Sequence, residues 1–188
     1  MWKSVAVALI FFGLSLVQLP AVAGDLPSQI QVGEHRLVLN GEGARTKMLL
    51  ELYVAGLYLT QPSSNAAQII AAEQPMAIRI QITSSFVSQK SLVDSLEEGF
   101  KNATGGDTRE IRKQIDAFRD CFKEAISKGD TFEMVYLPNQ GVIVNKNGKL
   151  KGSVAGTKFK HALFSIWLSN TPADATLKQA LLTTGKVR

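Results

Sequence analysis

Apolar and polar residues alternate along several short stretches of the chain, and a period of two is typical of half-buried β-strands. The stretch MAIRIQIT at 76–83 shows this pattern without interruption. Glycine, asparagine and proline lie between the stretches, as in the turns of an antiparallel meander. The pattern predicts strands at 30–32, 35–40, 76–83, 131–137, 142–144 and 149–154.

One apolar stretch, residues 48–59, has a length that fits either a strand or a helix. Its tyrosines and β-branched residues favour a strand, and the central Gly56 indicates that this strand is bent. Gly41 and Gly43 precede the stretch and interrupt the alternation. They predict a break between this strand and the one before it.

Apolar residues recur every three or four positions in other parts of the chain, as on one face of an α-helix. Residues 92–100 predict one helix, and a second runs from a cap at Asp107, with Glu110 in the capping-box position, to Gly129. Shorter helices are predicted at 64–72, with a serine cap, from Thr157 and around Leu177. Because strands and helices come in separate groups, the predicted fold is α+β, with an antiparallel sheet covered on one face.

The first 23 residues differ from the rest of the chain in composition. Lys3 precedes an apolar stretch at 5–17, and AVA at 21–23 is a small-x-small cleavage signal. This pattern predicts a secretory signal peptide at 1–23 and one mature domain at 24–188. The alternative is an uncleaved N-terminal anchor, although a spanning helix needs about 20 apolar residues. No later segment is apolar for that length, so we expect no membrane span after cleavage.

Charge, cysteine content and motifs narrow the classes of function. The net charge is +5, and the basic residues are mixed with acidic ones, so we expect no nucleic-acid partner. Cys121 is the only cysteine, which excludes an intrachain disulfide and indicates a buried core residue. With His35 and His161 far apart in sequence, no clustered zinc site is expected. The chain has no G-x-S-x-G motif and no phosphate loop, so we expect neither a hydrolase nor a nucleotide cofactor.

The stretch GEGARTKMLLELYVAGLYL places Arg45 at the start of a long apolar run. A guanidinium can donate two hydrogen bonds to one carboxylate or enolate, and a cation at the edge of an apolar cleft suits an amphipathic anion. Tyr53 and Tyr58 add two hydroxyl groups to the same run. Alternatively, Arg45 pairs with Glu42, Glu51 or a backbone carbonyl and only fixes a loop. The spacing supports both interpretations equally.

Two stretches, LNGEGARTKMLLELYVAGLYL and FKHALFSIWLSNTPADATLKQALL, resemble the chalcone isomerase-like proteins of bacteria. These proteins are the exported branch of a superfamily that includes plant chalcone isomerases and plastid fatty-acid-binding proteins. The resemblance covers residues 28–183. It implies an open-faced β-sandwich, in which a layer of helices covers a large antiparallel sheet and a ligand cleft lies between them. It also implies a periplasmic location.

The resemblance implies roles for individual residues. In the family, the arginine after G-x-G contacts the negative oxygen of the ligand, and Arg45 matches that position. The plant isomerases also use a threonine and a tyrosine. Tyr53 occupies the place of the threonine, and Ser88 is the best match for the tyrosine. Since the family's catalytic partners are not evident, the catalytic residues stay unassigned.

Three functions are compatible with the sequence. The favoured one is a non-catalytic protein that binds a fatty acid or another amphipathic carboxylate through Arg45, with Tyr53 or Tyr58 assisting. The second is an isomerase of the intramolecular lyase type that acts on an unknown phenolic substrate. In it, Arg45 stabilises a phenolate or enolate and a tyrosine relays a proton. The third is a structural or partner-binding protein whose cleft is closed. No residue pattern indicates the identity of the ligand or the oligomeric state.

Overall fold

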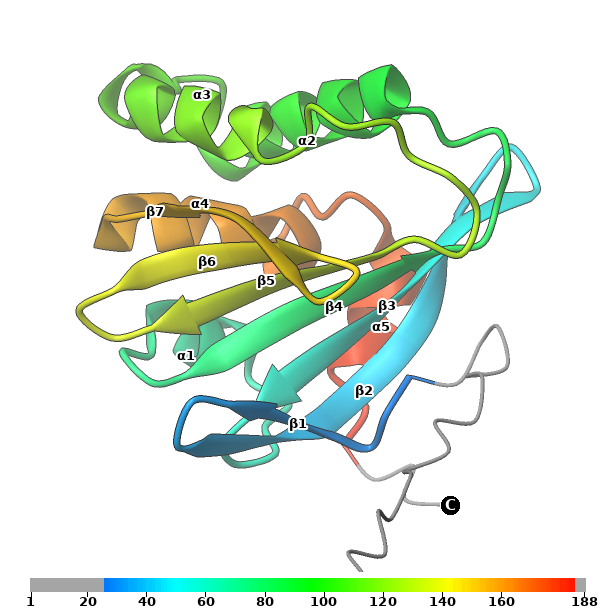
Figure 1. Cartoon of the computed structure of the whole chain (residues 1–188). Helices are drawn as coiled ribbons and strands as arrows, with labels where there is room; N and C mark the ends of the chain where they lie inside the picture. Colours follow the sequence, from blue (N-terminus) through cyan, green and yellow to red (C-terminus); the bar gives the residue numbers. More distant parts are fainter. Residues whose placement is uncertain (1–25, 185–188) are drawn as a thin grey trace, which may run out of the picture.

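Seven strands form one antiparallel sheet, in which each strand pairs with its neighbours along the chain (Figure 1). The computed structural model describes residues 26–184, so the predicted signal peptide at 1–23 lies outside the described residues. The strands are β1 (Gln29–Val32), β2 (His35–Lys47), β3 (Leu50–Leu59), β4 (Met76–Ile82), β5 (Thr131–Leu137), β6 (Gly141–Lys146) and β7 (Lys149–Val154).

The helices cover one face of this sheet, and the predicted α+β fold with its open-faced layering is confirmed (Figure 1). They are α1 (Ala66–Ala71), α2 (Gln89–Ala103), the 3₁₀ turn η1 (Arg109–Ile111), α3 (Arg112–Asp120), α4 (Thr157–Leu168) and α5 (Ala175–Leu181). Helix α4 packs against α1, α2 and β6, while α5 packs against β2 and α3 against β7. Among residues 26–184, no helix is long and apolar enough to cross a membrane.

Successive residues of a strand point to opposite faces of the sheet, and this separates the two apolar clusters of the molecule. On β3, Tyr53, Leu57 and their odd-numbered neighbours face the helices and join the main core. Tyr58 faces the other side and joins a smaller cluster with Leu37. Cys121 lies in the main core and is 5% exposed, as predicted for a buried core residue.

Strand β2 continues through Gly41 and Gly43 to Lys47, so the predicted break at these glycines is wrong. Both glycines lie against α5: a Cβ at Gly41 would clash with the carbonyl oxygen of Ala180, and one at Gly43 would lie 2.6 Å from the Ala180 side chain. Close packing of the helix, and not a turn, requires glycine here. As a result, Arg45 lies on a strand and not in a loop.

The helix predicted from Asp107 to Gly129 is much shorter in the structure. It consists of η1 and α3, neither of which has a side-chain cap, and the Asp107 side chain binds Arg109 instead. After α3 the chain crosses to the sheet, where Gly129 donates a backbone hydrogen bond to Ile82. Tertiary contacts therefore end the helix before its apolar pattern does. The cap of α1 is also Asn65 and not the predicted serine.

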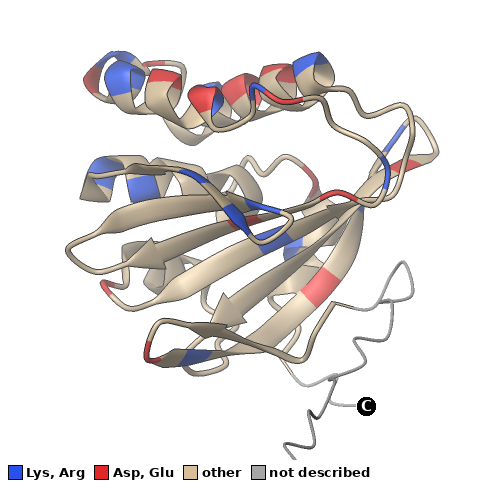
Figure 2. Ribbon diagram, viewed as in Figure 1, with Lys and Arg blue, Asp and Glu red and all other residues tan. Residues whose placement is uncertain are grey.

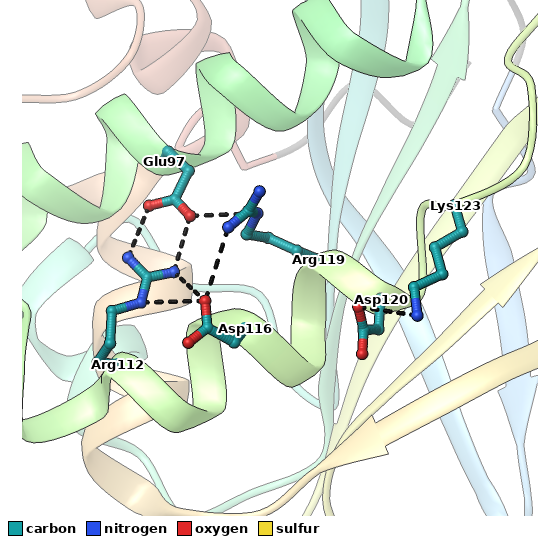
Figure 3. A network of polar contacts seen from close by, with 6 residues as sticks. All are labelled: Glu97, Arg112, Asp116, Arg119, Asp120 and Lys123. Carbon is teal, nitrogen blue, oxygen red and sulfur yellow. Dashed lines mark hydrogen bonds and ion pairs between the residues drawn. The ribbon is translucent and has the colours of Figure 1, made fainter.

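Helices α2 and α3 carry side chains of both charges (Figure 2) and are joined by an ion-pair network (Figure 3). Arg112 on α3 donates to both oxygens of Glu97 on α2, with N–O distances of 2.8 and 3.0 Å. Arg119 adds a contact of 3.3 Å to the same carboxylate, and Asp116 accepts from Arg112. The hydrogen bonds from Arg112 lower the pKa of Glu97. The network fixes the position of α2 above the sheet.

Candidate ligand-binding cavity

A cavity of about 510 Å³ lies between the sheet and the helices, at the end where β2 and β3 meet. Its volume falls within the range of about 300–1,000 Å³ that is typical of sites for small molecules. Residues from β2, β3, the turn between them, β4, α2, α4 and the segment before α2 line it. They are Arg45, Lys47, Met48, Leu50, Leu52, Tyr53, Ile80, Phe86, Val87, Ser91, Leu92, Asp94, Ser95, Leu96, Glu98, Ile166 and Trp167.

Most residues that line the cavity are apolar, and the apolar part of the lining continues to the molecular surface. Ile80, Leu92 and Trp167 are almost completely buried and form part of the inner wall. Met48 and Phe86, by contrast, are 92% and 76% exposed and mark the mouth. A cavity of this kind suits a ligand with a long apolar part.

Arg45 is the buried charged residue of this lining, with 9% of its surface exposed, whereas Lys47, Asp94 and Glu98 are exposed. Within residues 26–184, no hydrogen bond or ion pair joins its guanidinium to another residue. Its contact is with the Tyr53 ring, whose centre lies 6.0 Å from Cζ. Among the described residues, Arg45 therefore pairs with neither a glutamate nor a backbone carbonyl, and the alternative interpretation is not supported.

Tyr53 lies directly opposite Arg45 in the β2–β3 pairing and is 4% exposed. Its hydroxyl oxygen accepts a hydrogen bond of 3.0 Å from Nε1 of Trp167 on α4. This bond fixes the ring, and the phenolic proton has no acceptor among the described residues. The cavity thus places a second donor beside the guanidinium.

Tyr58 is the third residue that the sequence suggests for this site, but the structure does not bring it to Arg45. It points to the opposite face of the sheet, and its hydroxyl donates to the carbonyl oxygen of Pro27 at 2.9 Å. Burial raises the pKa of Tyr58 above its ordinary value. Tyr58 comes five positions after Tyr53, and an odd number of positions along a strand puts two side chains on opposite faces.

Ser88, which matches the place of the family's catalytic tyrosine, caps helix α2. Its hydroxyl oxygen accepts from the backbone N–H of Ser91 at 3.1 Å, and the Ser91 hydroxyl accepts from the N–H of Ser88. A capping box of this kind is a structural role. His35 and His161 do not line the cavity.

The acidic residues of the lining do not form a buried acid–base pair. Asp94 is exposed and lies 2.6 Å from Nζ of Lys90, and Glu98 is also exposed. Among residues 26–184, no group of three or more histidine, cysteine, aspartate or glutamate side chains could hold a metal ion. The cavity therefore offers an anion two buried donors, Arg45 and Tyr53, within apolar walls.

Two features of the site have no clear signal in the sequence. The hydrogen bond from Trp167 to Tyr53 joins residues 114 positions apart. The sequence indicates only that a buried indole N–H needs an acceptor, and not which residue supplies it. Phe86 reaches the mouth from the segment before α2, where the sequence SSFVSQKS shows no regular pattern. Both depend on how separate elements pack.

A second hollow, of about 480 Å³, lies between β2 and α5. Asn40, the glycines of β2 and Ala180 are among the residues that line it. Glu42 is its charged lining residue and is only half-buried. This hollow has no buried donor pair comparable to Arg45 and Tyr53.

Comparison with known proteins agrees with this architecture. The family model described as "Chalcone isomerase-like" matches residues 21–183. A solved structure of a fatty-acid binding protein of Arabidopsis thaliana, AtFAP1, superimposes with a TM-score of 0.65 and 21% sequence identity, over 84% of this chain and 91% of that one. None of the curated protein sequences compared with the chain matches it. Because the family match spans most of its length, the chain belongs to the chalcone isomerase-like family.

Proposed function

We propose that this protein is exported and binds an amphipathic carboxylate, such as a fatty acid, in the cavity beside Arg45 without converting it. The observation on which the proposal rests is a buried guanidinium that has no anionic partner among the described residues. A guanidinium at the edge of an apolar cavity can donate two hydrogen bonds to one carboxylate, so the site favours a ligand that brings a negative group. The fold-level likeness to a fatty-acid binding protein supports the same class of ligand.

In this proposal the head group and the tail of the ligand bind different parts of the cavity. The carboxylate accepts two hydrogen bonds from Arg45 and one from the Tyr53 hydroxyl. The hydrocarbon chain lies against the apolar wall formed in part by Ile80, Leu92 and Trp167. An isomerase would need a positioned group that transfers a proton. The described acids of the lining are exposed, so this role would fall to the Tyr53 hydroxyl, which already accepts a hydrogen bond from Trp167. We favour binding without turnover because the described lining offers Arg45 and one hydroxyl donor but no buried acid or base to act with them.

Native mass spectrometry of the purified protein tests the proposal. Wild-type protein is expected to retain or take up palmitic acid, and Arg45→Ala to bind it about 10- to 100-fold more weakly, as expected for hydrogen bonds to a charged group. Arg36→Ala is the matched control, because Arg36 is an exposed arginine on the same strand. The same spectra test export, since cleavage after Ala23 leaves a chain of residues 24–188.

Three results would contradict this function. Equal binding by wild type and Arg45→Ala would remove Arg45 from the site. If wild-type protein makes the absorbance band of an added chalcone disappear and Arg45→Ala does not, the isomerase function is favoured instead. If neither protein binds palmitic acid and the variant only melts at a lower temperature, Arg45 is a structural residue.

A further inference from the structure

The turn between β2 and β3 consists of two residues, Met48 and Leu49, whose φ angles are 51° and 66°. Positive φ at both positions is typical of a type I′ turn, in which asparagine and glycine are strongly preferred. The hairpin between β6 and β7 has the same geometry and uses Asn147 and Gly148, with φ angles of 51° and 74°. The hairpin of β2 and β3 therefore carries two bulky apolar residues at positions whose positive φ angles disfavour such side chains.

These two side chains are also fully open to solvent. Met48 is 92% exposed and Leu49 100%. Phe86, which is 76% exposed, lies in the segment between β4 and α2. This segment begins beside β3, because the N–H groups of Thr83 and Ser84 donate to the carbonyl oxygen of Leu52. Met48 and Phe86 both line the cavity. The turn between β2 and β3 and the segment between β4 and α2 lie at the same end of the molecule (Figure 1).

We propose that Met48, Leu49 and Phe86, here called the apolar tip, dock the protein onto the surface of a lipid bilayer. Neither folding nor solvation explains these residues, since the turn would be better formed by asparagine and glycine, and each side chain exposes apolar area to water. Insertion of the tip into the interfacial region of a bilayer removes that area from water. The free energy gained when the tip enters the bilayer then offsets the cost of the unfavourable turn.

The size of the tip favours a bilayer over a protein partner. A large aromatic side chain buries about 150–250 Å², so three apolar side chains fall short of the roughly 800 Å² that a partner contributes to a stable interface. A bilayer needs no complementary surface. Near the tip, Lys90 is paired with Asp94 at 2.6 Å, and the exposed Lys47 is balanced by the exposed Glu51. Docking is therefore expected on uncharged lipid as well as on anionic lipid.

Docking at the tip would turn the mouth of the cavity toward the bilayer. If the proposed function holds, an amphipathic carboxylate could then pass between membrane and cavity without crossing bulk water. Leu49 does not line the cavity, whereas Met48 and Phe86 do, so docking is measured by vesicle binding and not by binding of the ligand. The two proposals therefore fail separately: Arg45→Ala tests the ligand, and the tip variants test the membrane.

Hydrogen exchange of the full chain, with and without phosphatidylcholine vesicles, gives a local test. Vesicles are expected to slow exchange at 47–50 and 85–87 and to leave 147–148 unchanged, because these two turn residues have the same backbone geometry but are asparagine and glycine. This readout is independent of any binding by the N-terminal residues. Unchanged exchange at 47–50 would overturn the proposal.

Variants give the second test, by flotation with the same vesicles. Met48→Asn/Leu49→Gly is expected to bind them about tenfold or more weakly, because two apolar side chains are lost, and to melt at a higher temperature, because the turn is relieved. Leu150→Asn is the matched control, since Leu150 is 67% exposed beside the other hairpin. Equal flotation of the double variant and wild type would overturn the proposal. The proposal would also be overturned if wild type self-associates in the absence of lipid and the double variant does not.

Discussion

Three lysine or arginine side chains are buried among the described residues, and two of them have partners. Lys146 lies 3.0 Å from Asp130 and donates to the carbonyl oxygen of Ala125. Lys160, fully buried, donates to the carbonyl oxygens of Ile70 and Ala72 at the end of α1. Arg45 has no such partner within residues 26–184. This contrast separates a cation that stabilises the fold from one that is free to bind a ligand.

The contrast predicts opposite effects on stability. Lys160→Met leaves two half-buried carbonyls without this donor and is expected to lower the free energy of unfolding by about 3 kcal/mol. Arg45→Met removes a buried charge that lacks a partner, so the free energy of unfolding is expected to stay within about 1 kcal/mol of wild type or to rise. Urea denaturation of fatty-acid-free protein measures both. A loss in Arg45→Met as large as in Lys160→Met would make Arg45 structural.

At the scale of single residues, the sequence predicts part of the site. It suggests Arg45, Tyr53 and Tyr58, and the structure places the first two side by side at the cavity. Tyr58 lies on the other face, a consequence of strand periodicity that could have been applied once 48–59 was taken as a strand. The lack of a partner for Arg45 could not be predicted, because pairing depends on which side chains fold around it.

At the scale of elements, local patterns predict the presence of strands and helices better than their ends. Strand β2 extends seven residues beyond the predicted end at residue 40, because its glycines are required by the packing of α5. Helix α3 stops at Asp120, although the apolar pattern continues, because the following segment hydrogen-bonds to the sheet. In both places a contact between distant parts of the chain overrides the local signal.

The ion-pair network between α2 and α3 predicts a pH dependence of stability. The pKa of Glu97 is lowered from 4.5 in the folded protein, chiefly by hydrogen bonds from Arg112. Folding therefore gains stability from this carboxylate above pH 4.5 and loses it as the pH falls through the folded-state pKa. Glu97→Gln is expected to melt at a lower temperature than wild type at neutral pH and to lose less on acidification.

The matched control for this prediction is Glu98→Gln, the next position on the same helix. Glu98 is exposed and forms no ion pair with a described residue, so its replacement should leave the acid dependence as in wild type. Thermal unfolding followed across the acidic range measures all three proteins. Equal acid sensitivity of Glu97→Gln and wild type would show that the network does not contribute to the stability of the fold.

At the scale of the whole molecule, the cavity joins parts of the chain that no local pattern connects. The hairpin of β2 and β3, strand β4, helix α2 and helix α4 each contribute a wall. The resemblance of two short stretches to a known family predicts the fold and the cleft. It does not predict the volume or the exposed mouth, because these depend on side chains contributed by all the walls. The apolar tip likewise becomes visible only from backbone angles and exposure.

The division of the cavity into a charged end and an apolar remainder predicts how stability should change with the ligand. A ligand present at 100 times its dissociation constant stabilises the folded state by about 2.7 kcal/mol. For a chain of this size, that corresponds to a rise in melting temperature of about 5–10 °C. Each added methylene group strengthens binding by up to about 0.8 kcal/mol while it is buried. The rise should therefore grow with the chain length of the fatty acid until the apolar walls are filled.

The methyl ester of the same fatty acid separates the contribution of Arg45 from that of the walls. The ester keeps the hydrocarbon chain but loses the negative charge, so its effect on melting temperature should be much smaller than that of the acid. In Arg45→Met the acid and the ester should act alike, because the group that distinguishes them is gone. A wild-type protein that responds equally to both would bind by its apolar walls alone, and the guanidinium would then have no part in recognising the ligand.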